Sequence, residues 1–128
     1  MPSKIHHIAL EVADAAKSEA FYCGLLGFKK VGEHYFADRG RRIVFLDLDG
    51  VCIELLADEG CEAYEEPPAK KLGYKHLALL TDDVKGDCEK VRAAGFKIRL
   101  EPVDTALGSR ICYVEDPDGL PVELWQNL

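Results

Sequence analysis

The sequence predicts an α+β fold in which two tandem βαβββ modules form a curved sheet around a metal-binding cleft. Two observations lead to this prediction: the halves of the chain repeat one another, and each half carries one histidine and one glutamate at equivalent positions. A length of 128 residues suits one domain with its own core. We therefore expect residues 1–128 to be a single domain, with a first module at about 1–60, a linker at about 57–72 and a second module at about 73–128.

The internal repeat emerges when residues 5–56 are laid over residues 74–125 at an offset of 69, the difference between positions 76 and 7. The residues that match at this offset are His7 and His76, Leu10 and Leu79, Arg41 and Arg110, Asp49-Gly50 and Asp118-Gly119, and Glu54 and Glu123. The segments Gly27-Phe28-Lys29 and Gly95-Phe96-Lys97 match at an offset of 68 instead. This change predicts a one-residue insertion or deletion in a helix or a loop.

In the first half, an apolar run at residues 5–12 predicts the opening strand. Asp14 follows as a helix N-cap, and the helix is expected at about 15–26. Gly27 suits the left-handed position at a helix C-terminus. Three short strands complete the module, with a hairpin turn at Asp49-Gly50.

The second half repeats this order of elements. A strand is expected at residues 74–81, Asp83 is the N-cap, and the helix is expected at about 84–94, before Gly95. Three strands follow, with a hairpin turn at Asp118-Gly119. Because one module cannot bury both faces of its sheet alone, we expect the two modules to pack together and close a cleft.

Charge and composition exclude several classes of function. The formal net charge of −7 gives an acidic surface that repels phosphate backbones, so nucleic acid is not an expected partner. No apolar run is long enough to span a bilayer, and the first residues lack the apolar stretch of a signal peptide. The five cysteines lack close pairing, which is typical of a reducing compartment. We expect a cytoplasmic protein that acts on a small molecule, away from membranes.

The spacing of two histidines and two glutamates predicts a metal site. His7 and Glu54 are 47 residues apart, the difference between positions 54 and 7, and His76 and Glu123 have the same separation. Each glutamate lies in an apolar strand, where a carboxylate is costly unless it is paired or bound to a metal. We expect all four side chains to hold one divalent ion, and this ligand set suits Zn, Ni, Co, Mn or Fe. Coordination positions that remain open would admit substrate, as in catalytic sites.

Three further residues are candidates for substrate binding. Strand alternation places Glu11 on the same face as His7, while His6 is expected to face the opposite side. Arg41 and Arg110 are symmetry mates in the repeat, and we expect them to hold an anionic group of the substrate.

Four segments resemble the glyoxalase/bleomycin-resistance/dioxygenase group, which is the vicinal oxygen chelate superfamily. These segments are IHHIAL at 5–10, FYCGLLGF at 21–28, GYKHLA at 73–78 and EDPDGLPVEL at 115–124. The resemblance covers nearly the whole chain. It implies a single vicinal oxygen chelate domain and a homodimer, and it leaves open whether the site lies within one chain or across the dimer.

The pattern of one histidine and one glutamate in each module resembles glyoxalase I, which is lactoylglutathione lyase, and methylmalonyl-CoA epimerase. The resemblance to glyoxalase I implies a divalent-metal-dependent carbon–sulfur lyase or isomerase that removes a proton beside a carbonyl through a metal-stabilised enediolate. By the same resemblance, Glu54 and Glu123 bind the metal at rest and one of them takes the proton. Glu123 is the favoured base.

The sequence departs from glyoxalase I at one informative position. Glyoxalase I carries an arginine four residues after its first ligand histidine, where it binds the carboxylate of glutathione. Glu11 stands at this position and would repel that carboxylate. The substitution argues against glutathione as the thiol and leaves the true thiol substrate open.

Other members of the superfamily supply the competing interpretations. A methylmalonyl-CoA epimerase-like enzyme would use the same metal chemistry on a larger anionic ligand. An extradiol dioxygenase would use Fe(II) with two histidines and one carboxylate, which makes Glu54 a surplus ligand. A bleomycin-resistance-like protein would bind a drug without chemistry, and such proteins usually lack the complete ligand set. A fosfomycin thiol transferase would lack the glutamate of the first module.

Overall fold

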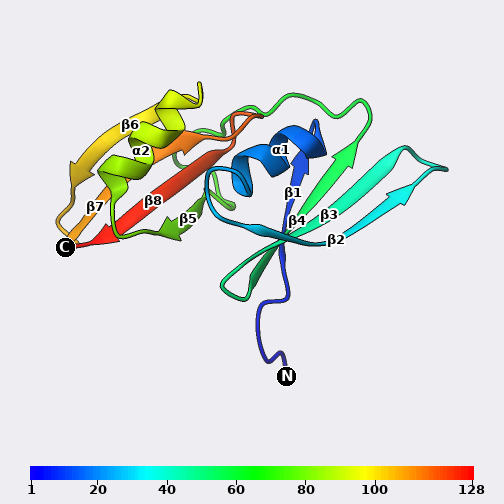
Figure 1. Ribbon diagram of the computed structural model, residues 1–128, viewed down its shortest axis with the longest axis horizontal. Helices are drawn as coiled ribbons and strands as arrows, with labels where there is room; N and C mark the ends of the chain where they lie inside the picture. Colours follow the sequence, from blue (N-terminus) through cyan, green and yellow to red (C-terminus); the bar gives the residue numbers. More distant parts are fainter. The chain divides into compact units, whose positions relative to one another are not determined.

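The computed structural model describes residues 1–128, and the chain divides into two compact units, Met1–Ala63 and Tyr64–Leu128. Each unit holds one helix and one four-stranded sheet, in the order strand, helix and three strands (Figure 1). The predicted α+β class and the tandem βαβββ modules are therefore confirmed. Neither helix is long and apolar enough to cross a bilayer.

The elements of the first unit are β1 (Ile8–Val12), α1 (Ala15–Tyr22), β2 (Lys29–Phe36), β3 (Arg41–Leu48) and β4 (Val51–Asp58). The sheet order is β1-β4-β3-β2, so the neighbour of β1 is β4, the last strand of the unit in sequence. Strand β1 is parallel to β4, while the other two pairs are antiparallel. The parallel pairing brings the opening strand beside the last strand of the module, where Glu54 lies.

The elements of the second unit are β5 (Leu77–Leu80), α2 (Val84–Ala93), β6 (Ile98–Asp104), β7 (Ser109–Glu115) and β8 (Pro121–Asn127). The order β5-β8-β7-β6 repeats that of the first unit, again with one parallel pair. Both opening strands are shorter than predicted, so His7 and His76 lie immediately before β1 and β5 rather than within them.

Both predicted N-caps are confirmed, because the Asp14 carboxylate accepts a hydrogen bond from the Lys17 amide and that of Asp83 accepts one from Gly86. Helix α1 ends before its predicted boundary. Beyond Tyr22 the chain continues as a turn, in which the Leu26 amide bonds to the Phe21 carbonyl five residues earlier. Gly27 and Gly95 then adopt φ values of 83° and 91°, as expected after a helix.

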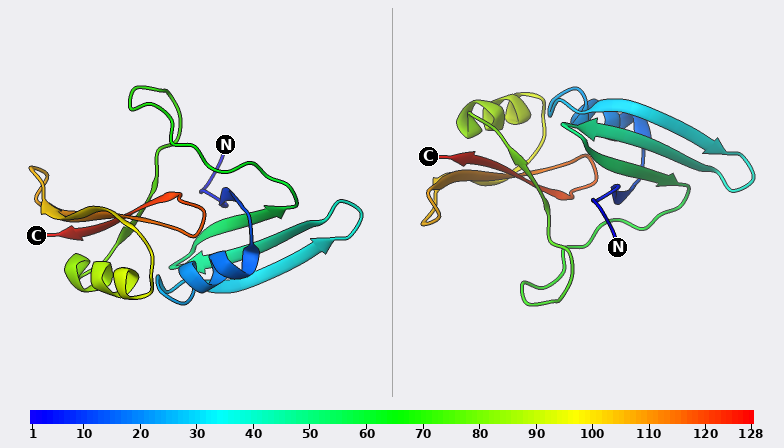
Figure 2. Two further views of the ribbon diagram at one scale, coloured as in Figure 1. Left: turned by 90° about the horizontal axis from the view of Figure 1, so that it is seen from above. Right: turned by 90° about the horizontal axis from the view of Figure 1, so that it is seen from below.

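Each helix packs on one face of its own sheet, as Figure 2 shows from above and below. The first unit's largest buried side chains are Val12, Phe21, Tyr22, Val44, Leu46, Ile53 and Leu55. The corresponding set in the second unit is Val84, Val91, Cys88, Cys112, Val114, Val122 and Leu124. Because strand side chains alternate, these residues define a helix face for each sheet and leave an opposite, open face.

Register across the hairpins corrects one prediction from the repeat. Phe45 lies opposite Glu54, and Tyr113 lies opposite Glu123, so β3 and β7 correspond at an offset of 68, the difference between 113 and 45. The loop between paired residues has one residue more in the second hairpin, because Asp47 pairs with Cys52 whereas Glu115 pairs with Pro121. One change of offset therefore lies in this loop. The predicted one lies between the helix N-cap and the following glycine, because Asp14 and Gly27 are 13 positions apart whereas Asp83 and Gly95 are 12 apart. In this register Arg42, not Arg41, is the counterpart of Arg110.

The two predicted hairpin turns also differ. Asp49 and Gly50 both have positive φ, as a tight two-residue turn requires. In the second hairpin Asp118-Gly119 belongs to a longer loop, which the Asp116 carboxylate organises by accepting bonds from the Asp118 and Leu120 amides.

The cap of α2 yields a stability prediction. Replacing Asp83 with Ala removes the acceptor for the Gly86 amide and should lower the free energy of unfolding by about 1 kcal/mol. Asp83→Asn is the matched control, since asparagine caps equally well. Chemical denaturation monitored by circular dichroism measures the difference, and equal midpoints for the two variants would contradict it.

Candidate functional site

In the first unit, His7 and Glu54 are brought together on the open face. In the parallel register Glu54 lies opposite Ala9, and Ala9 is two residues beyond His7. The distance from His7 Nε2 to Glu54 Oε2 is 3.8 Å, and both side chains are partly exposed. The Phe45 ring stands edge-on to the His7 imidazole, with 6.0 Å between the ring centroids.

The second unit builds the same pair more tightly. Glu123 lies opposite Ala78, and His76 Nε2 is 2.8 Å from Glu123 Oε2. Glu123 is only 5% exposed. The Tyr113 ring lies edge-on to His76, and its hydroxyl is hydrogen-bonded to Glu123. Burial, followed by the charge of Glu123 and this hydrogen bond, raises the pKa of the Tyr113 phenol.

The donor atoms of each pair fit a divalent transition metal. Two ligand atoms held about 2.1 Å from one ion at tetrahedral or octahedral angles lie roughly 3 Å apart. The nitrogen–oxygen separations of 2.8 and 3.8 Å bracket this value. Within either unit, no group of three or more metal-ligating side chains occurs. Each unit therefore brings together two of the four predicted ligands.

The structure places His6 against His7 instead of directing it away. Nδ1 of His6 lies 2.8 Å from Nδ1 of His7, so the Nε2 atom of His7 remains directed at Glu54. Ligand imidazoles commonly use one ring nitrogen for the metal and the other for a supporting hydrogen bond. The expectation that His6 faces the opposite side was wrong, because the chain before β1 does not follow strict strand alternation.

Glu11 and Arg41 meet on the open face of the first unit, together with Asp58. Arg41 Nε lies 3.1 Å from Asp58 Oδ1, and Arg41 Nη2 lies 3.5 Å from Glu11 Oε1. Burial and the neighbouring Asp58 raise the pKa of the Glu11 carboxyl, while the charge of Arg41 opposes the rise. Sequence reasoning missed Asp58, although its spacing of four from Glu54 puts both on one face of β4.

Arg110 lies away from the predicted site. Arg110 pairs with Gln126 in the β7–β8 ladder. It is an odd number of positions from Tyr113, which pairs with Glu123, so its side chain lies on the opposite face of the sheet, the helix face. There its Nε donates to Asp104 Oδ1 at 2.7 Å. Arg110 therefore does not share a face with the His76–Glu123 pair, because the extra loop residue reverses the direction of its side chain. The role of Arg110 in substrate binding stays a prediction.

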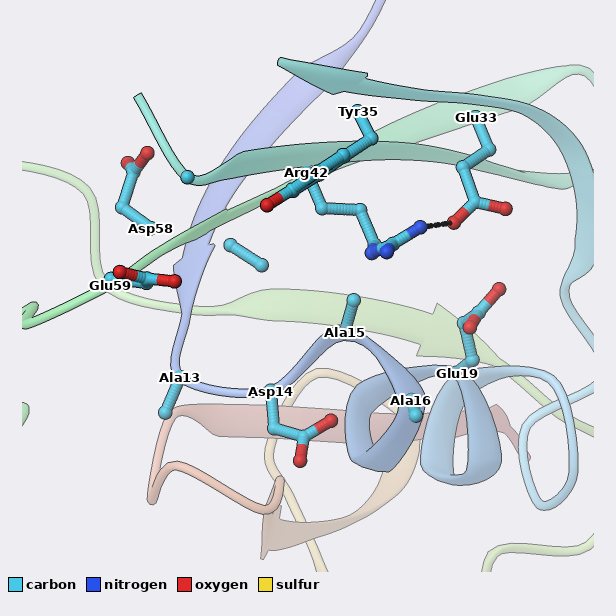
Figure 3. Close-up of a pocket in the computed structure, with 12 residues that line it drawn as sticks. Ala13, Asp14, Ala15, Ala16, Glu19, Glu33, Tyr35, Arg42, Asp58 and Glu59 are labelled. Atoms are coloured by element: carbon cyan, nitrogen blue, oxygen red, sulfur yellow. Dashed lines mark hydrogen bonds and ion pairs between the residues drawn. The ribbon is translucent and has the colours of Figure 1, made fainter. Parts of the chain in front are cut away.

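A separate hollow of about 460 Å³ occurs on the first unit, beside the N-terminus of α1 (Figure 3). Arg42 extends across it, stacks over the Tyr35 ring and forms an ion pair with Glu33. The hollow is lined largely by the helix face, so it is distinct from the His7–Glu54 pair on the open face.

Four of the five cysteines are poorly suited to nucleophilic chemistry. All five are free thiols. Burial raises the pKa of four of them, Cys23, Cys52, Cys88 and Cys112, the last to about 12. A raised pKa lowers the thiolate fraction, and the thiolate is the reactive form.

Comparison with known proteins identifies the family of the chain. The family model described as the Glyoxalase/Bleomycin resistance protein/Dioxygenase superfamily matches residues 4–124. The chain belongs to this superfamily. The matched region includes both His–Glu pairs, from His7 to Glu123.

Three individual matches illustrate the relationship. The chain is 34% identical to the uncharacterized protein YwkD of Bacillus subtilis, with 96% of each chain covered. It is 33% identical to a probable lactoylglutathione lyase of Vibrio cholerae, over 97% of this chain and 91% of that protein. A crystal structure of a glyoxalase family protein from Enterococcus faecalis is 25% identical, covers 95% of this chain and 96% of its own, and superposes with a TM-score of 0.76.

The contact between Tyr113 and Glu123 generates a spectroscopic prediction. In the metal-free protein, Glu123→Gln should lower the pKa of Tyr113, because the negative charge that opposes phenolate formation is lost. Ultraviolet difference titration measures this change, and Tyr113→Phe assigns the signal. An unchanged titration in Glu123→Gln would show that the two side chains do not interact.

Proposed function

We propose that this chain is a glyoxalase I-like, divalent-metal-dependent lyase or isomerase that removes a proton from a carbon beside a carbonyl. The observation that carries the proposal is the His–Glu pair at the same place in each unit. Relatives about a third identical that carry the name lactoylglutathione lyase support it. The proposal extends to a homodimer in the cytoplasm, a compartment consistent with five free thiols.

In this proposal His7, Glu54, His76 and Glu123 together hold one ion of Zn, Ni, Co, Mn or Fe. The support is chemical: two imidazoles and two carboxylates suit these ions, and the two carboxylates neutralise a dication. When bound, the ion would polarise the substrate carbonyl and stabilise the negative charge of the enediolate. The buried charge of Glu123 would then have a compensating partner besides His76.

Glu123 acts as the base. Its carboxylate takes the proton from the carbon that bears the hydroxyl and the sulfur and returns it to the former carbonyl carbon. The hydroxyl proton passes to the former carbonyl oxygen, which completes the isomerisation. The Tyr113 hydroxyl orients this carboxylate through its hydrogen bond, whereas Phe45, at the same place beside Glu54, has no hydroxyl to donate. This difference supports unequal roles for the two glutamates, with Glu54 as a permanent ligand.

Metal binding tests the shared site. Titration of metal-free protein with each of the five ions, followed by calorimetry and elemental analysis, should give one ion per chain. Replacing either His7 or His76 with Ala should weaken binding at least about 100-fold, beyond the loss typical of outer-shell partners. His34→Ala, on β2, is the control. Two ions per chain, or a loss confined to one histidine, would refute a shared site.

Solvent exchange tests the base. With hemithioacetals and acyl-CoA esters in deuterated water, the metal-loaded protein should incorporate deuterium beside the carbonyl. Glu123→Gln should slow this exchange about 10²- to 10⁴-fold even with saturating metal, the range for loss of a general base. Glu54→Gln should recover activity as metal is added. The reverse pattern would make Glu54 the base.

The same panel separates the other members of the superfamily. Exchange confined to acyl-CoA esters would identify an epimerase. Oxygen consumption with catechols and Fe(II) would identify a dioxygenase. Metal-free protein that binds drugs and catalyses no exchange would overturn the enzymatic proposal.

A further inference from the structure

The open faces of the two units carry the same ligands but different neighbours. Glu11 lies two residues beyond Ala9, and Leu80 lies two residues beyond Ala78, so the two are structural counterparts. Leu80 is 71% exposed and lies opposite Trp125 in the ladder. The same position is thus acidic in the first unit and apolar in the second.

The partners of Glu11 are also confined to the first unit. Arg41 pairs with Asp58 in the β3–β4 ladder, and at the corresponding place in the β7–β8 ladder Ser109 pairs with Asn127. The second unit therefore has neither the guanidinium nor the second carboxylate. We call Glu11, Arg41 and Asp58 the charged triad; nothing in the duplicated scaffold requires it, because the counterpart unit folds without it.

The charged triad bears a net negative charge and faces solvent. Two carboxylates flank one guanidinium, and the side chains of Glu11, Asp58 and Arg41 are 50%, 31% and 27% exposed. Because Arg41 already interacts with both acids, an anionic ligand would have to displace one of them. A cation would instead add a third favourable contact to Glu11 and Asp58.

The position of the triad relates it to the proposed metal site. Glu11 follows Ala9 by two residues, and Ala9 lies opposite Glu54, so Glu11 is displaced along the strand by roughly 7 Å. This distance is within reach of a substituent on a small thiol whose hemithioacetal lies at the proposed metal site, of which Glu54 is a ligand. Burial and the neighbouring Asp58 raise the pKa of the Glu11 carboxyl, and a cation placed beside it would favour the ionised form.

We propose that the charged triad selects a substrate whose thiol portion carries an ammonium group, which binds Glu11 and Asp58 on the open face of the first unit. This inference rests on the proposed function and names its substrate class: a hemithioacetal of a cationic thiol, in place of a thiol that ends in a carboxylate. Arg41 is a positioning residue that holds both acids through its ion pairs.

Three thiols of similar size and different charge test the proposal. They are thiocholine, 2-mercaptoethanol and 3-mercaptopropionate, each used as its hemithioacetal with methylglyoxal and the metal-loaded full-length chain. Thiocholine is chosen because its quaternary nitrogen cannot cyclise with the aldehyde. We expect kcat/KM to fall from cationic to neutral to anionic thiol, by about tenfold or more overall, chiefly through KM. Added salt should reduce the preference, since the triad is exposed.

Substitutions at Glu11 test its role directly. Glu11→Gln should bring the three thiols close to equal kcat/KM, and Glu11→Arg should reverse their order. Asp58→Asn should give an intermediate loss of preference. Glu33→Gln is the matched control, because it also removes a carboxylate that is ion-paired with an arginine on β3, in this case Arg42. Glu33 lies outside the open face, so the order of the three thiols should persist in this variant.

Binding measured without turnover separates the two proposals. Amide chemical shifts are followed while metal-free protein is titrated with S-methylthiocholine or with the S-methyl derivative of 3-mercaptopropionate. Chemical-shift changes at the triad with the cation alone support the inference. If in addition no hemithioacetal is turned over, the proposed function is contradicted but the inference is not. Turnover of all three thiols without charge preference, or equal shifts with both probes, overturns the inference and leaves the proposed function intact.

Discussion

The rest of the structure depends on one constraint: a carboxylate in an otherwise apolar strand has to lie beside an imidazole. Glu123 is almost completely buried, and its negative charge is tolerated because His76 lies within 2.8 Å and Tyr113 is hydrogen-bonded to it. The βαβββ order makes this arrangement possible, since it pairs the opening strand with the last strand of each module. Residues nearly fifty positions apart therefore meet across one parallel ladder.

Each sheet separates stability from chemistry by its two faces. The helix face carries the buried aliphatic and aromatic side chains, so it accounts for most of the hydrophobic stabilisation of its unit. The open face carries the His–Glu pair and is free to vary without loss of the core. Both units carry the pair, whereas Phe45 and Tyr113 differ at the corresponding place and the charged triad is found in the first unit alone. The two units thus have matching His–Glu pairs with unequal surroundings.

Much of this arrangement is readable from local signals. Helix caps depend on one side chain and the nearest amides, so Asp14 and Asp83 were predicted correctly. The His–Glu pairs were recognised because the spacing of 47 residues recurs, and a repeated spacing implies a repeated fold. That both pairs serve one ion stays a prediction. The end of α1 and the starts of β1 and β5 were misplaced by a few residues, since these boundaries depend on packing as well as on the local sequence.

The sequence by itself determined the α+β class, the two modules and the four ligand candidates, because strand and helix periodicity and an internal repeat are written along the chain. Only the tertiary structure decided which of Arg41 and Arg110 lies on the open face, and that Asp58 joins Glu11 there. The reason is the two-residue period of a strand: one additional residue in the second hairpin shifts β7 by one position against the repeat offset of 69, which turns its side chains to the other face. Such a shift becomes visible only when the partner strand is in place.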